Sequence, residues 1–571
     1  MGGPGAIAEV AFDAGEAAGP VLAAWRLALT AALDALGWPV ELHIRQHDDG
    51  HGHPGADLVF AAPPDHLYLA TDINDWAIQA ANATTRDAVG AAGAGDPARQ
   101  LPAWRETIAH EQQPRVAALR TAAAARDLPI LADDDELTIG HGRRAVSYPA
   151  RLPPPPEAVP WDSLGRVPIA LITGTNGKTT TARLLARIAL KAGFTPGNTS
   201  TDGMSVAERP LEAGDWTGPS AARTVLRHPE VDLAVLEVAR GGILRRGLGV
   251  DRCDAAAVLN VSADHLGEYG IHDLAAMASV KAVVGSIVAP HGRVVLGAES
   301  PPLVDLVARG HRFPAAIAWF ARDEHHPTLA AHLASGGEAW FVSATGRLTR
   351  GRGDHRDELV AIAELPFCFG GAASHNVRNA LAAAALASAL GLPDPAIVAG
   401  LRSFHASVSD NPGRANLAIV AGVQVFLDFA HNPDGIRSLH GLLTALRGPR
   451  RLLLGIGVAG DRSDETIRDL ARAAHELAPD QVIVRDLEHY LRGREPGEVP
   501  ALLRDELIRL GHPASALTTA SDEVDLLRRG LAWAEPGDLV AILVHVERDE
   551  IQAELRRLGA IADPGPDPRP A

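Results

Sequence analysis

The sequence predicts an α/β protein with two domains built on parallel sheets and a small α+β domain before them. Apolar strand-like runs alternate with helical patterns from about residue 161 onwards, which is typical of parallel sheets covered by helices. The polyproline run Pro153–Pro156 separates this part from residues 1–150, and a turn cluster at Asp410–Gly413 divides it again. A length of 571 residues fits three or four domains.

The first expected domain covers residues 1–150. Apolar residues recur with helical spacing in Ala17–Leu36 and in Val116–Arg126. Two shorter runs, Asp57–Ala62 and Leu128–Leu131, have the length of strands. We therefore expect a small α+β domain here.

The two expected α/β domains cover residues 161–409 and 410–562. Their strand-like runs are Val167–Ile172, Leu233–Val238, Ala255–Val261 and Arg293–Leu296 in the first, and Val423–Phe429, Arg451–Ile456, Gln481–Val484 and Asp538–Val544 in the second. Helical patterns separate these runs, so each set predicts a sheet with helices on its faces. The Pro-rich tail, residues 563–571, is expected to be disordered.

Composition narrows the class of protein and its compartment. The net charge of −17 disfavours a nucleic-acid partner, which would need a basic footprint. Two cysteines exclude a disulfide framework and favour a reducing compartment. The N-terminus lacks the pattern of a secretory leader, and no apolar stretch is expected to reach the roughly 20 residues of a membrane span. We expect a cytoplasmic enzyme without a membrane partner.

A phosphate-binding loop follows the first strand of the central domain. The strand Val167–Ile172 runs into Thr173-Gly-Thr-Asn-Gly-Lys-Thr-Thr-Thr181, and a helix over Ala182–Lys191 follows. Glycines allow backbone N–H groups to converge on phosphate, and the helix N-terminus adds its dipole. The expected nucleotide-binding residues are Gly174, Thr175, Asn176, Gly177, Lys178, Thr179 and Thr180. Ile172 stands where the general motif has its first glycine, and the loop alone does not distinguish a kinase, GTPase, motor or ligase.

Polar residues at the ends of later strands point to metal chemistry. Glu237 ends one apolar strand, and Asn260 ends the next, followed by Asp264 and His265. The carboxyl ends of parallel strands open onto the ligand crevice of an α/β sheet. A carboxylate and an imidazole there could hold a metal ion that neutralises a phosphorylated intermediate. Lys281 lies in the helical stretch that follows.

The order and spacing of these motifs resemble the ATPase domain of the Mur ligases. The match is closer to one branch, the Mur-like module of cyanophycin synthetase, over roughly residues 160–550. The motifs that carry this closer resemblance are Thr201-Asp-Gly203, Asp215-x-Thr217-Gly-Pro219, Ala239-Arg-Gly-Gly-Ile-Leu-Arg245, His375-Asn-x-x-Asn379, Asn411-Pro-Gly-Arg414, Asp428-Phe-Ala-His-Asn-Pro433, Gly460-Asp-Arg462 and Leu491-Arg-Gly-Arg494.

The resemblance implies a role for each matching residue. Lys178, His265, Lys281 and His431 are implied to be catalytic, with Lys281 carbamylated and Lys178 on the β- and γ-phosphates. Thr179 and Glu237 are implied to bind one Mg²⁺ and His265 a second. Asn376, Asn379, Arg414 and Asp428 are implied to bind ATP together with the phosphate loop. The implied substrate-binding residues are Thr201, Asp202, Thr217, Arg240, Arg245, Asn432 and Asp461.

The N-terminal region resembles the end of the cyanophycin synthetase N-terminal domain in Leu137-Thr-Ile-Gly-His-Gly-Arg143. In that enzyme an ATP-grasp domain follows. Here about 30 residues separate Arg143 from the phosphate loop, too few for a domain of roughly 200 residues. The resemblance therefore implies only the Mur-like reaction: an acyl-phosphate ligase joining a carboxylate, such as an aspartate side chain of a peptide, to arginine or another basic amino acid. Related enzymes self-associate, so a homo-oligomer is expected.

Three other readings remain open. A folylpolyglutamate-type or peptidoglycan-type ligase would take a different acceptor, although the Arg240–Arg245 and Gly460–Arg462 segments argue against it. A regulatory nucleotide-binding protein would not need Thr179, Glu237, His265 and Lys281 together. A P-loop kinase or GTPase would leave the C-terminal α/β domain without a role.

Overall fold

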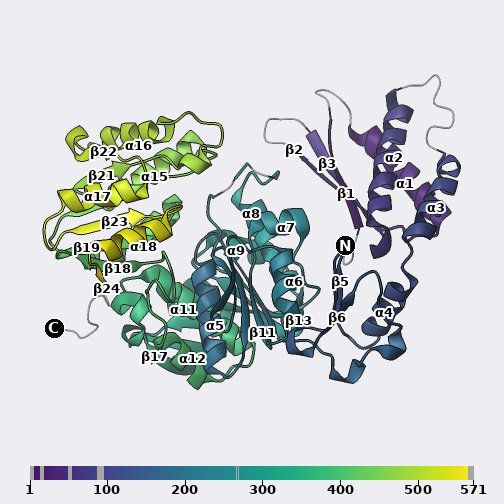
Figure 1. The fold of residues 1–571 in the computed structure, drawn as a ribbon, viewed down its shortest axis with the longest axis horizontal. Coiled ribbons are helices and arrows are strands. Elements are labelled where there is room, and N and C mark those ends of the chain that lie inside the picture. The colour runs from purple at the N-terminus through teal and green to yellow at the C-terminus, as the bar shows by residue number, and fades with distance from the viewer. Residues whose placement is uncertain are drawn as a thin grey trace. The chain divides into compact units, whose positions relative to one another are not determined.

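The computed structural model describes residues 5–12, 18–48, 54–86, 96–264, 266–267 and 269–562. The chain forms two compact units (Figure 1). Unit 1 consists of Met1–Leu137, Tyr148–Trp161 and Leu266–His272. Unit 2 consists of Thr138–Ser147, Asp162–His265 and Asp273–Ala571. The second unit contains two large sheets.

Unit 1 is a small α+β structure. Its elements are β1 (Gly5–Ala11), α1 (Ala18–Leu36), β2 (Leu42–Asp48), β3 (Pro54–Ala61), α2 (Leu67–Arg86), α3 (Leu101–Glu111), α4 (Pro114–Ala124) and β4 (Ile130–Ala132). Strands β1, β3 and β2 form an antiparallel sheet in that order. Trp25, Leu29, Phe60 and Ile73 form its core, and the Trp25 indole donates to Asn74 Oδ1 at 2.9 Å.

Helix α1 is the one candidate, among the described residues, against the expectation that no apolar stretch reaches the roughly 20 residues of a membrane span. This helix has 19 residues and a mean hydropathy of 1.2, which suffices to cross a membrane by length and composition. Its residues Trp25, Leu29 and Leu33 are fully buried in the core of unit 1. The same apolar character therefore serves the packing of a core helix.

The segment Thr138–Ser147 is part of unit 2, although the sequence places it in the first 150 residues. It contains the end of β5 (Glu136–Ile139) and the start of β6 (Val146–Pro149). The Arg143 amide donates to the Val231 carbonyl at 2.8 Å, and the Arg143 guanidinium pairs with Asp232 at 2.9 Å. The motif Gly140–Arg143 thus attaches this segment to the strand region of the phosphate-loop domain.

Replacing Gly142 by alanine should destabilise unit 2 by about 1–3 kcal/mol. Gly142 has φ +56°, and a Cβ there would overlap the Val231 carbonyl oxygen. Gly310→Ala is the matched control, because Gly310 also has a positive φ, +97°, but has nothing within 4 Å of its Cβ position. Urea unfolding followed by tryptophan fluorescence measures both variants. Equal losses in the two variants would show that the contact with Val231 does not matter.

The central part of unit 2 is built on a sheet of 11 strands, ordered β10-β9-β8-β11-β7-β12-β13-β14-β15-β16-β17. The strands from β8 to β15 are parallel, and hairpins extend both edges. The strands are β7 (Ile169–Thr173), β8 (Pro196–Ser200), β9 (Gly203–Val206), β10 (Arg209–Ala213), β11 (Leu233–Glu237), β12 (Cys253–Val258), β13 (Val288–Gly297), β14 (Ala316–Asp323), β15 (Glu338–Val342), β16 (Arg347–Arg352) and β17 (His355–Ala361).

Helices cover this sheet. They are α5 (Lys178–Lys191), α6 (Pro219–Arg227), α7 (Arg240–Arg246), α8 (Leu274–Ser286), α9 (Pro301–Ala308), α10 (Pro327–Ala334), α11 (Ser374–Ala389) and α12 (Asp394–Arg402). Helices α5 and α11 lie side by side and contact each other (Figure 1). Every residue of the α11 segment Leu381–Ala387 is buried. The small alanine side chains let α11 approach the sheet closely, which brings its first turn to the phosphate loop.

The C-terminal part of unit 2 has a sheet of seven strands, ordered β22-β21-β20-β23-β19-β18-β24. The strands from β22 to β19 are parallel, while β18 and β24 pair antiparallel at one edge. Its elements are β18 (Asn416–Val420), β19 (Val423–Asp428), α13 (Pro433–Ser438), α14 (His440–Arg447), β20 (Leu452–Ile456), α15 (Asp464–Glu476), β21 (Gln481–Val484), α16 (Glu498–Arg509), β22 (Leu517–Thr519), α17 (Glu523–Trp533), β23 (Leu539–Leu543), α18 (Arg548–Arg557) and β24 (Ile561–Ala562). The predicted α/β class with parallel sheets is confirmed.

Candidate active site

The phosphate loop connects β7 to α5 and is held from the next strand. Gly177, the residue before α5, has φ +88°. Asn260, at the end of β12, accepts from the Asn176 amide at 2.8 Å and donates to the Asn176 carbonyl at 2.9 Å. Lys178 Nζ donates to the carbonyls of Gly174 and Thr175 at 3.1 and 3.0 Å. The loop is therefore preformed, with its lysine ammonium at the mouth of the loop.

Glu237 provides a buried carboxylate beside the loop. It ends β11 and is 2% exposed. Its oxygens accept from the Thr179 hydroxyl at 2.9 Å and from the Thr201 hydroxyl at 2.8 Å. A hydroxyl and a carboxylate side by side form the hard oxygen set that Mg²⁺ prefers. These residues fit a magnesium ion next to the phosphate loop.

Lys281 lies in α8 and is buried. Burial, followed by the charges of Lys178 and Arg240, lowers its pKa to about 7, although Asp264 acts in the opposite direction. An amine with this pKa has a substantial neutral fraction near pH 7, unlike an ordinary lysine. His265, the implied ligand of a second metal ion, lies outside the described residues.

Two loop residues after β19 reach the central domain. The side chains of Asn432 and Asn176 pair at 3.0 and 3.2 Å. Asp264 accepts from Asn432 Nδ2 at 3.3 Å and lies 3.4 Å from His431 Nε2. Asn432 also caps α13 by accepting from the Gly435 amide at 2.8 Å. The loop after β19 is therefore anchored directly on the phosphate loop.

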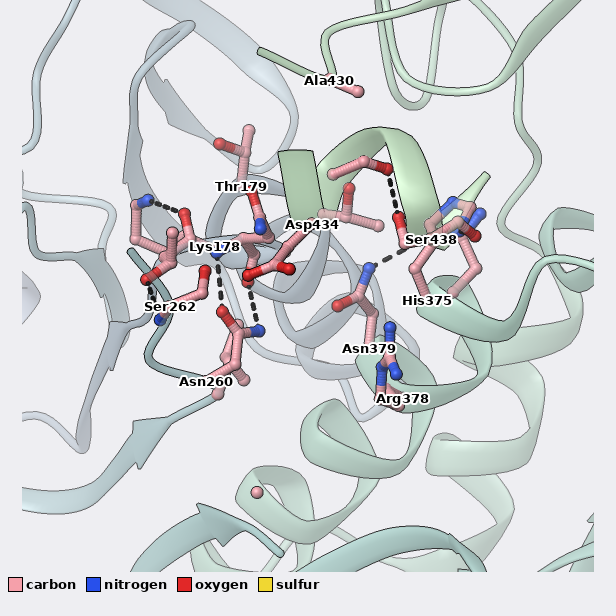
Figure 2. Close-up of a pocket in the computed structure, with 18 of the residues that line it drawn as sticks. Lys178, Thr179, Asn260, Ser262, His375, Arg378, Asn379, Ala430, Asp434 and Ser438 are labelled. Carbon is pink, nitrogen blue, oxygen red and sulfur yellow. Dashed lines mark hydrogen bonds between the residues drawn. The ribbon is translucent and has the colours of Figure 1, made fainter. Parts of the chain in front are cut away.

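A cavity of about 730 Å³ opens between these elements. Figure 2 shows Lys178 and Thr179 on one side and His375, Asn379 and Ser438 on the other. Of the predicted residues, those that line the cavity are Thr175, Asn176, Gly177, Lys178, Thr179, Thr180, Thr201, Thr217, Asn376, Asn379, Arg414, Asp428 and His431. The predicted residues outside this lining are Gly174, Asp202, Glu237, Arg240, Arg245, Lys281, Asn432 and Asp461.

The predicted residues that do not line the cavity differ in burial. Glu237, Lys281 and Asn432 are buried next to residues of the wall. Arg240 is buried at the start of α7, whereas Arg245 is exposed and donates to the Gly241 carbonyl at 3.1 Å. Asp461 is partly exposed and pairs with Arg462 at 3.0 Å.

Sequence reasoning missed one charged group of the cavity wall. Glu299 accepts from Arg378 at 3.0 Å and from the Arg322 guanidinium at 3.2 Å, and all three residues line the cavity. Arg378 stands inside the quoted motif His375-Asn-x-x-Asn379, so its position was a usable signal. Glu299 follows β13, and Arg322 lies in β14. Neither residue belongs to a motif that the sequence analysis used.

A phosphate loop, a buried carboxylate and a cavity shared by two α/β domains define a P-loop nucleotide-binding protein of the two-domain type. Residues 172–387 match the family model described as the Mur ligase middle domain, and residues 413–543 match the Mur ligase, glutamate ligase domain. The chain belongs to the Mur ligase family, whose members are ATP-dependent ligases that form carbon–nitrogen bonds and use Mg²⁺.

Several known proteins are similar to this chain. Cyanophycin synthetases of Trichormus variabilis and a Synechocystis species are 37% identical over 384 residues, which is 67% of this chain. The chain spans only 42–43% of the length of those two proteins. A UDP-N-acetylmuramoyl-L-alanyl-D-glutamate–2,6-diaminopimelate ligase of Alkalilimnicola ehrlichii is 29% identical over 74% of this chain and 78% of that protein. The structure of E. coli FolC in complex with DHPP and ADP covers 68% of this chain and 89% of FolC, with 20% identity and a TM-score of 0.51, and it shows the same fold.

Proposed function

We propose that this chain joins a carboxylate to an amine through an acyl-phosphate, with ATP converted to ADP and phosphate. The observation that carries the proposal is the meeting of two loops: the phosphate loop of the central domain and the His431–Asn432 loop of the C-terminal domain border one cavity. The first loop has the form of a triphosphate-binding loop, and we propose that an acyl group and an amine meet beside the second.

The substrates we propose are an aspartate side chain of an aspartate-containing peptide and arginine or another basic amino acid. The 37% identity to cyanophycin synthetases over the Mur-like part supports this choice. A cationic amine would need carboxylates in the C-terminal domain, and Asp434 lines the cavity there. Partly exposed Asp461 follows β20 in the same domain. A homo-oligomer and a cytoplasmic location remain our proposals.

The residues support a simple order of events. Lys178 offsets charge on the β- and γ-phosphates while the acceptor carboxylate attacks the γ-phosphate in line. Thr179 and Glu237 would hold one Mg²⁺, and we propose that His265 and a carbamylated Lys281 hold a second; bound there, the ions would offset negative charge on the phosphates and the acyl group. The C-terminal domain, which contributes Arg414 to the cavity wall, would exclude water from the site, since an acyl-phosphate hydrolyses readily. His431, which lines the cavity, would orient the amine that then attacks the acyl carbon, and Asn432 would hold the His431 loop in place through its bonds to Asn176.

Phosphate release from ATP tests the proposal. The purified chain is incubated with Mg-ATP, a panel of aspartate-containing peptides and each basic amino acid. Release that needs both an acceptor and an amine supports the ligase, and mass spectrometry then identifies the amide product. Acceptors of the folylpolyglutamate and peptidoglycan types are tested in parallel, and release that depends on one of them would favour the other ligase class. Nucleotide binding without turnover over the whole panel would favour a regulatory protein.

A further inference from the structure

Asp202, one of the predicted substrate-binding residues, does not line the cavity. Its carboxylate is surrounded by three arginine side chains. Its carboxylate accepts from Arg548 at 2.9 Å and from Arg183 at 3.2 Å, and Arg414 lies at 4.0 Å. Burial acts to raise the pKa of this carboxyl, but Arg414, Arg548 and Arg183 together lower it below the ordinary value. Asp202 is therefore a charged, buried group that joins the two domains.

The arginines also hold the backbone between the domains. Arg183 lies in α5, directly after the phosphate loop, and donates to the Asp410 carbonyl at 3.1 Å. Arg548 begins α18 of the C-terminal domain and donates to the Pro412 carbonyl at 3.2 Å. Both arginines thus fix the segment that leads into Arg414.

The loop that presents Arg548 is itself preorganised. The buried carboxylate of Glu523 accepts from the amides of His545 and Glu547, each at 2.7 Å, and from the Val546 amide at 3.1 Å. Three successive backbone amides on one carboxylate restrict the loop strongly. Arg548 follows directly, so its direction is set by the C-terminal domain and not by its own flexibility.

Arg414 is the member of the cluster that reaches the nucleotide cavity. Its guanidinium lies 4.0 Å from the centre of the Phe429 ring and lines the cavity with Thr201. Thr201 in turn donates to Glu237, the proposed magnesium ligand. Asp202 is shared by three guanidinium groups and lies 4.0 Å from that of Arg414, and the charges of Asp428 and Glu237 also act on Arg414. Because Arg414 has only this long contact with Asp202 and lines the cavity, its guanidinium can also contact an anion bound there.

We infer that Arg548 is a positioning residue: through Asp202 and the Pro412 carbonyl it holds Arg414 against the end of the cavity where the terminal phosphate of ATP would lie. This inference rests on the proposed function, because it assigns the nucleotide to this cavity. It gives the C-terminal domain a direct part in recognising a triphosphate as opposed to a diphosphate. No quoted motif contains Arg548.

Nucleotide affinity tests this assignment without any ligase substrate. Calorimetry with Mg²⁺ compares AMP-PNP and ADP for wild type, Arg548→Gln, Arg548→Lys and Asp202→Asn. Arg548→Gln should weaken AMP-PNP about tenfold and ADP by less than twofold, and Arg548→Lys should restore part of the loss. Asp202→Asn should show the same selective loss. Arg556→Gln is the matched control, because it removes an exposed arginine of the same helix.

Hydrogen exchange on the nucleotide-free variants separates the inference from the proposed function. If Arg548 holds the segment, Arg548→Gln should speed exchange at Asn411–Asn416 and at Asn198–Gly203, whereas Arg556→Gln should not. Equal exchange in the two variants would overturn the inference, as would equal losses for AMP-PNP and ADP. Failure of the wild-type chain to bind any nucleotide would refute the proposed function, while the exchange result would still decide whether Arg548 holds this segment.

Discussion

A Lys178→Met variant should release phosphate from ATP about 10²- to 10³-fold more slowly than the wild-type chain. The Lys178 ammonium lies at the carbonyls of Gly174 and Thr175 and lines the cavity. Methionine keeps the length of the side chain but removes the charge that would offset the β- and γ-phosphates. The loss should appear in kcat as well as in nucleotide affinity, because the charge matters most when the phosphate is being transferred.

Lys191→Met is the matched control for this change. Lys191 ends the same helix, α5, and is exposed at its far end from the phosphate loop. Its replacement removes an equal charge and should leave turnover within about twofold, as for most surface substitutions. If Lys178→Met kept turnover at the level of Lys191→Met, the loop would not be the site of phosphoryl transfer.

Parts of the structure could be predicted because local pattern and tertiary position coincide. The phosphate loop and Glu237 were found from strand ends, since a buried strand shows as an apolar run and the chain must leave the sheet at its carboxyl end. Strand β8, Pro196–Ser200, was not predicted, because its sequence, Pro-Gly-Asn-Thr-Ser, is not apolar although every residue is buried. Strands β16 and β17 were not predicted, because arginine and other polar residues interrupt the apolar pattern of Arg-Leu-Thr-Arg-Gly-Arg and His-Arg-Asp-Glu-Leu-Val-Ala.

Side-chain contacts between the central and C-terminal domains could not be predicted from the sequence. Asn176 and Asn432 are 256 residues apart, and Asp202 and Arg548 are connected only through the folded chain. A motif shows which residue types occur together along the chain, but it does not show which of them face each other after folding. Asn260 illustrates the difference: its place at a strand end suggested the metal site, and its side chain instead pairs with the backbone of Asn176.

Replacing Lys281 by alanine should remove most ATP turnover, and millimolar formate or acetate should restore part of it. The chain has three lysines among its 53 lysine and arginine residues, and two of them, Lys178 and Lys281, lie at the site. A guanidinium cannot replace an amine that must react with CO₂, whereas arginine serves well for ordinary ion pairs. The presence of a lysine, and not an arginine, at this buried position therefore favours a chemical role.

Because the pKa of the Lys281 amine is about 7, the amount of carbamate should depend on pH. Only the neutral amine reacts with CO₂, so carbamate at Lys281 should increase as the pH rises through about 7 and fall below it. Carbon-13 NMR of protein equilibrated with labelled bicarbonate measures the carbamate directly. The signal should persist in Lys191→Met and vanish in Lys281→Ala.

Lys281→Arg separates the loss of the proposed carbamate from the loss of packing. The arginine side chain fills the buried position but cannot form the carbamate, so this variant should be inactive and should not respond to formate. Lys281→Ala leaves room for a small carboxylate, which can take the place of the carbamate beside Lys178 and Asp264, so added formate should restore part of its turnover. Full activity of Lys281→Ala without any added acid would contradict the carbamate and show that turnover does not need the buried amine.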